Sequence, residues 1–271
     1  MREIKAHRGL SEMDLSAPRL VLFSDVHLNP AEKAIDLAFS NFLTELNQSC
    51  QTIQTPVFIL GDLFETWIGD DIINTHNPWL DHKISLLQSL AQITPVFFIH
   101  GNRDFLIHET FESTTGIRCL PESLILRWQG IRILLCHGDH LCTQDKAYMA
   151  FRTMVRSQVW QTEFLAQSLA QRESIAAQIR MQSKQSTPLK HADALDICPQ
   201  STAYYLQQFK PNLFIHGHTH KPALHHEHNA LRIVLGDWNP QASWLELNSD
   251  QGSISGQLTA HGWSKTFNVG L

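Results

Sequence analysis

Short apolar runs that each end in polar residues are the feature that most limits what this chain can fold into. Each run has the length and composition of a buried β-strand. Residues 31–47 and 79–90, which lie between the first runs, space their apolar side chains as helices do. Strands that alternate with helices indicate an α/β fold. The runs cover residues 19–23, 56–60, 95–99, 131–135, 213–215 and 231–235.

The polar clusters that follow these runs are rich in side chains that bind metals. In an α/β sheet, sites form beyond the carboxyl ends of the strands. Such residues recur at that place after five of the runs, and this repetition favours a shared pocket. The clusters contain Asp25 and His27, then Asp62, then Asn102, Arg103 and Asp104, then His137 and Asp139, and finally His218 and His220.

The stretch at 214–222 carries three histidines at alternate positions. His216, His218 and His220 could face one way, since a strand directs alternate side chains to the same side. Imidazole is the commonest metal ligand near neutral pH, although a lone histidine is more often a core or surface residue. The clusters elsewhere in the chain make the metal-ligand interpretation the stronger one here.

The composition excludes several classes of function. The chain has 271 residues, 43% hydrophobic and 17% charged, as in an ordinary globular protein. Its net charge of −5 provides no basic surface for nucleic acid. Its five cysteines form no CxxC pair, which favours a reduced, cytosolic protein. We find no secretory signal and no apolar run of the roughly 18 residues that a membrane-spanning helix needs, so any membrane contact is expected to be peripheral.

Residues 143–198 interrupt the alternation of strands and helices. Within them, residues 147–185 have helical spacing throughout and no strand signal. Spacing alone favours a helical hairpin packed on the sheet over a cap between two halves of the core. We expect a loosely held N-terminal extension at 1–17, a core at 18–142 and 199–271, and a helical insertion at 143–198.

The candidate ligands are too many for a single tetrahedral zinc ion with an open position. Imidazoles and carboxylates together suit two ions of manganese, iron or zinc, with one Asp bridging them. Two such ions about 3.5–4 Å apart can hold a bridging hydroxide that attacks phosphorus in line with the leaving oxygen. No protein nucleophile is then required, and the sequence has neither a Walker-type loop nor a Gly-x-Ser-x-Gly motif. The candidates are Asp25, His27, Asp62, Asn102, His137, His218 and His220.

The order and spacing of these motifs resemble the calcineurin-like binuclear metallophosphoesterases over nearly all of residues 18–247. The resemblance implies two packed β-sheets flanked by helices, an α/β (α+β) fold in four layers with a helical cap insertion. The motifs are Asp25-x-His27, Gly61-Asp62, Gly101-Asn102-Arg103-Asp104, His137-Gly138-Asp139 and Gly217-His218-Thr219-His220.

The same resemblance implies a division of the ligands between two metals. It leaves His216 without a ligand role and makes Asp104 and Asp139 groups that orient the ligands. One metal would be held by Asp25, His27, Asp62 and His220, and the other by Asp62, Asn102, His137 and His218.

Arg103 departs from the wider family, most of whose members have His after the Asn of this motif. That histidine assists the leaving group, whereas arginine cannot act as a general acid at neutral pH. Arginine does bind phosphate oxygens through two parallel hydrogen bonds. The departure disfavours a generic phosphomonoesterase and favours a substrate with more phosphate charge. The expected catalytic groups are Arg103 and a metal-bound hydroxide bridging at Asp62.

Longer segments are similar to one family within this group, the UDP-2,3-diacylglucosamine pyrophosphohydrolases of lipid A biosynthesis. The resemblance implies a hydrolase with two Mn²⁺ per chain, in which water attacks the α-phosphorus of UDP-2,3-diacylglucosamine. The products would be UMP and 2,3-diacylglucosamine 1-phosphate (lipid X). The similar segments are GDLFETWIGDD, FIHGNRDFL, HGDHLCTQDKAYMAFR, RMQSK and IHGHTHKPALH.

By position, this resemblance also implies a set of substrate-binding residues. Thr187 stands where the family commonly has Asn, and its single hydroxyl offers fewer hydrogen bonds than an amide does. The set is Asn102, Arg103, Asp145, Tyr148, Ser183, Thr187, Lys190 and His218.

The helical insertion sits where that family carries a lipid-binding cap. An apolar cleft between its helices would bury two acyl chains, at about 0.8 kcal/mol for each buried methylene. Its basic residues would contact phosphates and anionic headgroups, with a solvated helix face as the alternative. We expect peripheral attachment to the cytoplasmic side of the bacterial inner membrane, with no protein or nucleic-acid partner. The basic residues are Arg152, Arg156, Arg172, Arg180, Lys184 and Lys190.

Two other functions stay open. One is another binuclear metallophosphoesterase that acts on a soluble phosphodiester or nucleotide, and Arg103 and the apolar insertion argue against it. The other is a non-catalytic protein of this fold, against which the full ligand set argues. The sequence does not assign the acyl-chain preference, the metal used in the cell, the oligomeric state, or a role for Glu65, Asp70 and Asp71.

Overall fold

The computed structural model describes residues 5–7, 10–186 and 196–269. Its strands form two sheets of seven strands each. The sheet that contains β3, called the β3 sheet below, has the order β14-β13-β12-β3-β4-β5-β6, and β3 to β6 run parallel. Its strands are β3 (Arg19–Phe23), β4 (Val57–Ile59), β5 (Val96–Ile99), β6 (Arg118–Leu120), β12 (Trp244–Asp250), β13 (Ser253–Ala260) and β14 (Trp263–Val269).

The second sheet, called the β8 sheet below, has the order β1-β2-β7-β8-β9-β11-β10. Strands β8, β9 and β11 run parallel, and β7 and β10 lie antiparallel to their neighbours β8 and β11. Its strands are β1 (Lys5–His7), β2 (Leu10–Leu15), β7 (Ser123–Trp128), β8 (Ile131–Cys136), β9 (Leu213–His216), β10 (Ala223–Glu227) and β11 (Ala230–Val234).

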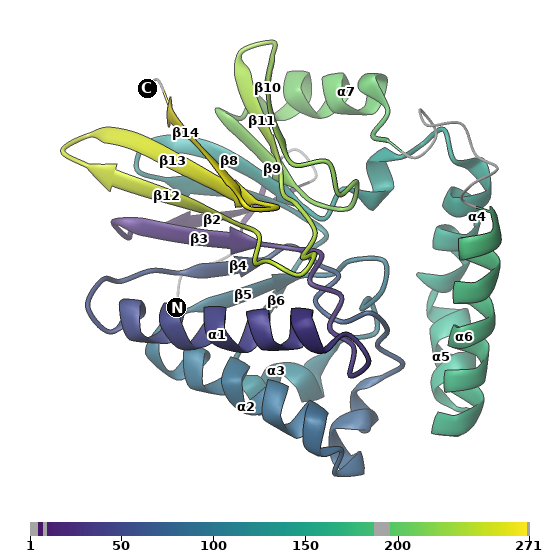
Figure 1. The fold of residues 1–271 in the computed structure, drawn as a ribbon. Coiled ribbons are helices and arrows are strands. Elements are labelled where there is room, and N and C mark those ends of the chain that lie inside the picture. Colours follow the sequence, from purple (N-terminus) through teal and green to yellow (C-terminus); the bar gives the residue numbers. More distant parts are fainter. Residues whose placement is uncertain (1–4, 8–9, 187–195, 270–271) are drawn as a thin grey trace.

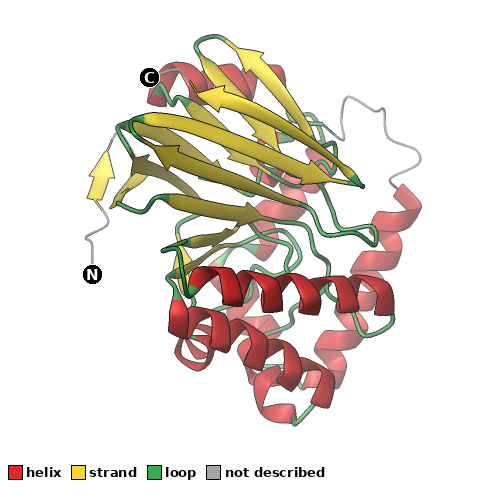
Figure 2. Ribbon diagram, turned by 60° about the vertical axis from the view of Figure 1, so that its left-hand side comes forward, coloured by secondary structure: helices red, strands yellow, loops and turns green. Residues whose placement is uncertain are grey.

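The two sheets stack face to face, and helices cover their outer faces (Figure 1, Figure 2). Alternate side chains along each strand divide between the two faces. In β3, Leu20 and Leu22 pack between the sheets, and Val21 and Phe23 pack against helices. The β3 sheet is covered by α1 (Lys33–Cys50), α2 (Pro78–Ile93) and α3 (Glu109–Thr115), and the β8 sheet by α7 (Pro199–Phe209). The predicted fold, two packed sheets flanked by helices, is confirmed.

The strand runs and helices expected from the sequence are present, with ends that differ by a few residues. Helix α2 shows how the sequence sets such an end. Asn77 accepts hydrogen bonds from the backbone N–H groups of Trp79 and Leu80, and Pro78 occupies the first turn, where no N–H is needed. The short 3₁₀ helices η1 (Asp70–Thr75) and η2 (Asp139–Leu141) complete the order of elements.

Three helices stand at one end of the sheets, beside the carboxyl ends of the parallel strands (Figure 1). They are α4 (Lys146–Val155), α5 (Gln158–Leu165) and α6 (Leu169–Ser186), and we call them the cap. The helical interpretation of residues 147–185 is confirmed, whereas the exact limits of the predicted insertion at 143 and 198 stay a prediction. Among the described residues, no helix combines the length and the apolar character needed to cross a membrane.

The expectation of a loosely held N-terminal segment is wrong over Leu10–Leu15. These residues form β2, which pairs in parallel with β7 and buries Met13. At the end of this segment, the carbonyl of Ala17 accepts a hydrogen bond from the indole N–H of Trp128 at 2.8 Å. The sequence did not reveal this strand because its apolar residues are sparse and interrupted by charges.

Candidate metal centre and cavity

The structure brings all the predicted metal ligands together at one end of the two sheets. The loops that carry Asp25 and His27, Asp62 and Asn102 follow β3, β4 and β5 in the β3 sheet. His137 follows β8 in the other sheet, and His218 and His220 follow β9. The cluster therefore joins the two sheets, and neither sheet alone supplies all of its members.

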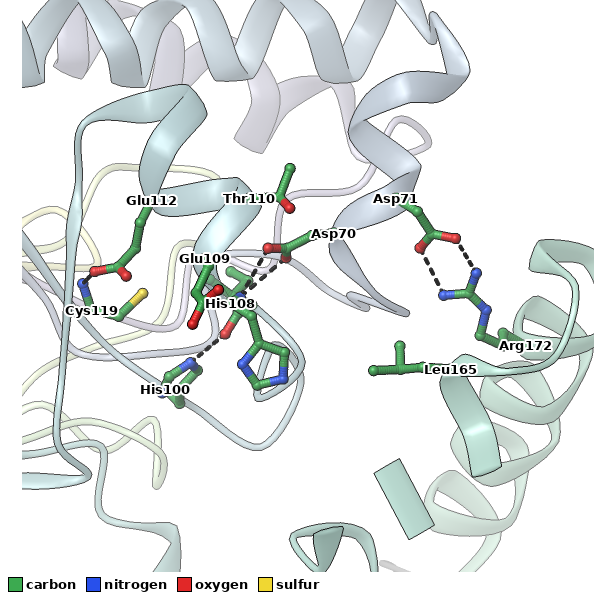
Figure 3. A pocket seen from close by; sticks show the side chains of 11 residues that line it. Asp70, Asp71, His100, His108, Glu109, Thr110, Glu112, Cys119, Leu165 and Arg172 are labelled. Carbon is green, nitrogen blue, oxygen red and sulfur yellow. Dashed lines mark hydrogen bonds and ion pairs between the residues drawn. The ribbon is translucent and has the colours of Figure 1, made fainter. Parts of the chain in front are cut away.

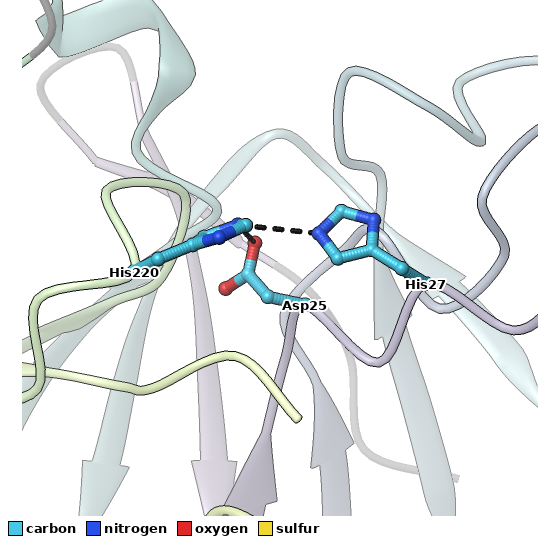
Figure 4. Close-up of side chains that lie close together, drawn as sticks. All are labelled: Asp25, His27 and His220. Atoms are coloured by element: carbon cyan, nitrogen blue, oxygen red, sulfur yellow. Dashed lines mark hydrogen bonds and ion pairs between the residues drawn. The ribbon is translucent and has the colours of Figure 1, made fainter. Parts of the chain in front are cut away.

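One part of the cluster is formed by Asp25, His27 and His220 (Figure 4). The Nε2 atoms of His27 and His220 lie 3.2 Å apart, and Nε2 of His220 lies 3.3 Å from Oδ1 of Asp25. Two imidazole nitrogens and a buried carboxylate therefore point at the same small volume, which suits a bound divalent cation.

The second part is formed by Asn102, His137 and His218. Oδ1 of Asn102 lies 3.0 Å from Nε2 of His137 and 2.9 Å from Nδ1 of His218. On its other side, His137 donates a hydrogen bond from Nδ1–H to the carbonyl oxygen of Leu60 at 2.8 Å, which directs Nε2 at the cluster. Asp62 lies between the two parts, since the ligand atoms of Asp25, Asp62 and His137 are all within 4.8 Å of one another.

The backbone at the ligands adopts a conformation that few residues accept. Asp25, His27, Asp62, His218 and His220 have φ between 53° and 67°, in the left-handed region. Asp and His tolerate this region better than most residues, but it still costs on the order of 1–3 kcal/mol at each position. Strain of this kind is retained where the surrounding structure enforces it, commonly at functional sites.

Close packing of the loops explains two of the glycines in the motifs. A Cβ atom at Gly101 would lie 2.1 Å from Oδ1 of Asp62, and one at Gly217 would lie 2.2 Å from Oδ2 of Asp25. Any larger residue at either position would displace a carboxylate of the cluster. The glycines therefore make room for candidate ligands as well as allowing a turn.

The electrostatics of the cluster favour positive charge. Burial would lower the pKa of His137, but the carboxylates of Asp62 and Asp25 outweigh it and raise the pKa to about 9. Burial would raise the pKa of Asp25, but its contact with His220 lowers it well below the ordinary value. Burial and the charge of His137 lower the pKa of His218 to about 4, so this imidazole is neutral and can donate an electron pair. These donors and this field fit the two divalent cations that the family implies.

Asp104 lies behind the ligands and holds two of their loops. Its carboxylate accepts hydrogen bonds from the backbone N–H groups of Gly101, at 2.9 Å, and Leu63, at 2.7 Å. His216, by contrast, faces away from the cluster. Its Nδ1 lies 3.0 Å from the carbonyl of Gly217, and its Nε2 accepts from Arg232 at 3.3 Å, so it is a satisfied core histidine.

A cavity of about 490 Å³ opens beside the ligand cluster, between the core and the cap. Asn102 and His218 belong to both the cluster and the cavity wall. Its polar wall includes six of the predicted substrate-binding residues, whereas Thr187 and Lys190 lie outside the described residues. The six are Asn102, Arg103, Asp145, Tyr148, Ser183 and His218.

The rest of the cavity wall is largely apolar. An apolar cleft was expected between the cap helices, whereas this cavity takes part of its apolar lining from the core, which the sequence did not indicate. Aromatic side chains come from the core segments after β4 and β5 and from α4 and α5 of the cap. The aromatic residues that follow the Asp62 and Asn102 motifs in the sequence could have indicated that the core contributes to this apolar wall. The apolar lining includes Trp67, Phe105, Leu106, Phe151, Trp160, Phe164 and Ile179.

Arginines of the cap contact the loops of the core. Arg152 of α4 donates to Asp139 at 2.7 Å, and Arg156, the residue after α4, donates to the carbonyl of Gly101 at 2.8 Å. Asp139 also accepts from the hydroxyl of Tyr148 at 2.6 Å, so the loop after β8 is tied to α4 twice. The predicted role of Asp139, to orient the metal ligands, stays a prediction.

From α6, Arg172 and Arg180 reach the segment between Asp62 and η1. Arg172 is buried and donates to the carbonyl of Ile68 at 2.6 Å and to Asp71 at 2.8 Å. This pair lies beside a second hollow of about 540 Å³, which contains none of the predicted metal ligands (Figure 3). Arg180 pairs with Glu65, a residue to which the sequence assigned no role.

Comparison with known proteins agrees with this geometry. Residues 18–222 match the family of calcineurin-like phosphoesterases. A protein of Xanthomonas oryzae named UDP-2,3-diacylglucosamine hydrolase is 41% identical over 86% of this chain and 97% of its own. A protein of the same name from Serratia proteamaculans is 39% identical over 85% of this chain and 95% of its own. Another, from Bordetella parapertussis, is 37% identical over 89% of this chain and 95% of its own. The chain belongs to the calcineurin-like phosphoesterase family.

Proposed function

We propose that this protein hydrolyses the pyrophosphate bond of UDP-2,3-diacylglucosamine in the presence of two Mn²⁺, releasing UMP and 2,3-diacylglucosamine 1-phosphate. The observation that carries the proposal is the continuity between the ligand cluster and the apolar cavity, because Asn102 and His218 belong to both. A substrate with a diphosphate at one end and acyl chains at the other matches this division. The names of the sequence relatives support the same substrate.

The chain supplies distinct groups for the two ends of such a substrate. Asp25, Asp62 and the histidines of the cluster would hold the cations, which when bound supply Lewis-acid catalysis and a water nucleophile near neutral pH. Arg103 would bind phosphate oxygens, since its guanidinium lies at the cavity wall with Nε 3.7 Å from Asp62. The aromatic side chains of α4 and α5 would bury the acyl chains.

We infer peripheral attachment to the cytoplasmic face of the bacterial inner membrane. The cap exposes large apolar side chains, with Met154, Val159 and Met181 between 49% and 69% exposed. The arginines of α4 and α6 contact the core, so the exposed apolar side chains are what supports this inference. Apolar side chains that enter the headgroup region would allow the substrate to pass from the bilayer into the cavity.

The decisive experiment compares three substrates with purified protein loaded with Mn²⁺. We expect UMP release from UDP-2,3-diacylglucosamine in mixed micelles, and at least about 100-fold lower kcat/KM with UDP-N-acetylglucosamine, which lacks the acyl chains. In ¹⁸O-labelled water the label should enter UMP, since water attacks the α-phosphorus. If the lipid substrate stays intact while bis(p-nitrophenyl) phosphate is hydrolysed, the alternative of a soluble phosphodiester substrate replaces this proposal.

A further inference from the structure

Glu65 occupies a position where three functional segments meet. It follows Asp62 by three residues, and its backbone N–H donates to the carbonyl of Leu28 at 3.1 Å. Leu28 and Phe64 form a β-bridge, so the segment after β4 lies beside the segment that carries His27. The backbone of Glu65 is therefore fixed with respect to one of the candidate metal ligands.

The two carboxylate oxygens of Glu65 contact three side chains. Oε2 lies 3.3 Å from Nδ1 of His27 and 3.4 Å from a guanidinium nitrogen of Arg103. Oε1 accepts from Arg180 of the cap helix α6. One side chain thus contacts a candidate metal ligand, the arginine expected to bind phosphate, and the cap.

The orientation of His27 gives this contact a consequence for metal binding. Its Nε2 faces the ligand cluster, 3.2 Å from Nε2 of His220, and its Nδ1 is a buried atom whose neighbouring oxygen belongs to Glu65. A carboxylate beside Nδ1 favours the tautomer protonated there, which leaves the electron pair of Nε2 directed at the cation site. Among the described residues, no other hydrogen-bonding partner is found at Nδ1 of His27 that could select between the two tautomers.

We propose that Glu65 is a positioning residue that orients His27 for metal binding and holds Arg103 at the cavity wall, with Arg180 linking both to the cap. The assignment for Arg103 rests on the function proposed above, whereas the assignment for His27 needs only the metal. Outer carboxylates that orient ligating histidines typically contribute about 10- to 100-fold to metal affinity, and we expect an effect in that range.

The test measures Mn²⁺ binding to metal-free protein by titration calorimetry, without any substrate. Glu65→Gln keeps the size of the side chain and removes its charge, and we expect about 10-fold or more weaker binding. Asp71→Asn is the matched control, because Asp71 also pairs with an arginine of α6 but does not touch His27 or Arg103. Its affinity for Mn²⁺ should stay within about twofold of the wild type, as should that of Arg180→Gln.

A second variant and a second readout separate positioning from loss of structure. Glu65→Asp keeps the charge on a shorter side chain and should lose less affinity than Glu65→Gln, and thermal unfolding of each metal-free variant checks its fold. At saturating Mn²⁺, Glu65→Gln should still lower kcat, since Arg103 has lost a partner, whereas Arg180→Gln should raise KM and leave kcat nearly unchanged.

Two results would overturn the proposal. One is an Mn²⁺ affinity of Glu65→Gln within about twofold of the wild type, and the other is an equal loss of affinity in Asp71→Asn. If the wild type binds Mn²⁺ but does not hydrolyse UDP-2,3-diacylglucosamine, the proposed function fails while the role of Glu65 toward His27 is still decided by the titration.

Discussion

The cap is attached to the core through a larger share of polar contacts than the two sheets use with each other. Strands β3, β8 and β9 bury aliphatic and aromatic side chains on both faces, so the stacking of the sheets depends on apolar contact. Of the described side chains of residues 146–186, only Val155, Phe164 and Arg172 are buried. Phe164 and partly buried apolar side chains such as Trp160 and Leu165 pack on the core, and arginines add the polar contacts described above.

This difference separates the two tasks of the proposed enzyme. Apolar burial is non-directional and insensitive to pH, so it holds the candidate ligands in one arrangement. Arginine contacts depend on charge and geometry, and each can be lost without disturbing the sheets. We therefore expect the part of the site that would perform the chemistry to be the more rigid one, and the part that would bind the lipid to open more readily.

The largest expected effect comes from the ligand cluster. Asp62→Asn removes a charge shared by both halves of the cluster, and we expect hydrolysis to fall by roughly 10³-fold or more. Thermal unfolding of the metal-free protein should change little, because Asn keeps the shape and can still accept the hydrogen bond from Arg103 N–H. A rate near that of the wild type would show that the chemistry does not depend on this cluster.

Two alanine substitutions, one in the core and one in the cap, test the comparison of these regions most directly. Ile133→Ala creates a cavity between the sheets and should lower the free energy of global unfolding by about 2–5 kcal/mol. Arg172→Ala leaves the carbonyl of Ile68 without its donor and should cost about 2 kcal/mol, confined to the cap. Native-state hydrogen exchange should then accelerate in α5 and α6 only. Equal acceleration in β3 and β8 would contradict the separation.

Deletion of residues 1–15 examines the edge of the core. A loosely held extension could be removed without a change in stability. Loss of β2, however, exposes the edge of β7 and removes the buried Met13. We expect a loss of about 2 kcal/mol, or a fall of roughly 4–8 °C in Tm, with the rate per folded molecule retained. A Tm equal to that of the full chain would show that β2 does not stabilise the sheet.

The smallest expected effect concerns the pH dependence of the cap. The hydrogen bond from Arg172 lowers the pKa of Asp71, so its stabilisation is complete above the ordinary Asp pKa and is lost as pH falls through the lowered value. Because the Asp71 side chain is half exposed, the free energy involved is below about 1 kcal/mol. The opening free energy of α6, from hydrogen exchange corrected for intrinsic rates, should decrease with acidification in the wild type and less in Asp71→Asn. Identical pH profiles would exclude this contribution.

Much of the fold could be predicted because its central strands are continuous apolar runs. The strand predicted at residues 19–23 has the same bounds as β3 in the structure. A strand buried on both faces is a continuous apolar run and can be recognised with little tertiary context. The strands β13 and β14 were not predicted. Their side chains are exposed along one or both faces, so their composition resembles that of loops.

The candidate site could be predicted for a related reason. Parallel strands deliver their carboxyl-terminal loops to one edge, and the motifs after them converge, as expected from their positions. The contacts of Glu65 could not be predicted, because Arg180 lies 115 residues away in the chain and only the docked cap brings the two together. Whether the converging residues bind metal and substrate stays a prediction for the experiments above.

The placement of the ligands on two different sheets has a consequence for the newly made chain. Asp25, His27, Asp62 and Asn102 come from one half of the sandwich, and the remaining imidazoles come from the other. A polypeptide that has finished only one layer holds an incomplete set of donors and cannot assemble a competent centre. Both sheets would therefore have to fold and pack before the centre could act, so partly folded molecules would have no hydrolytic activity.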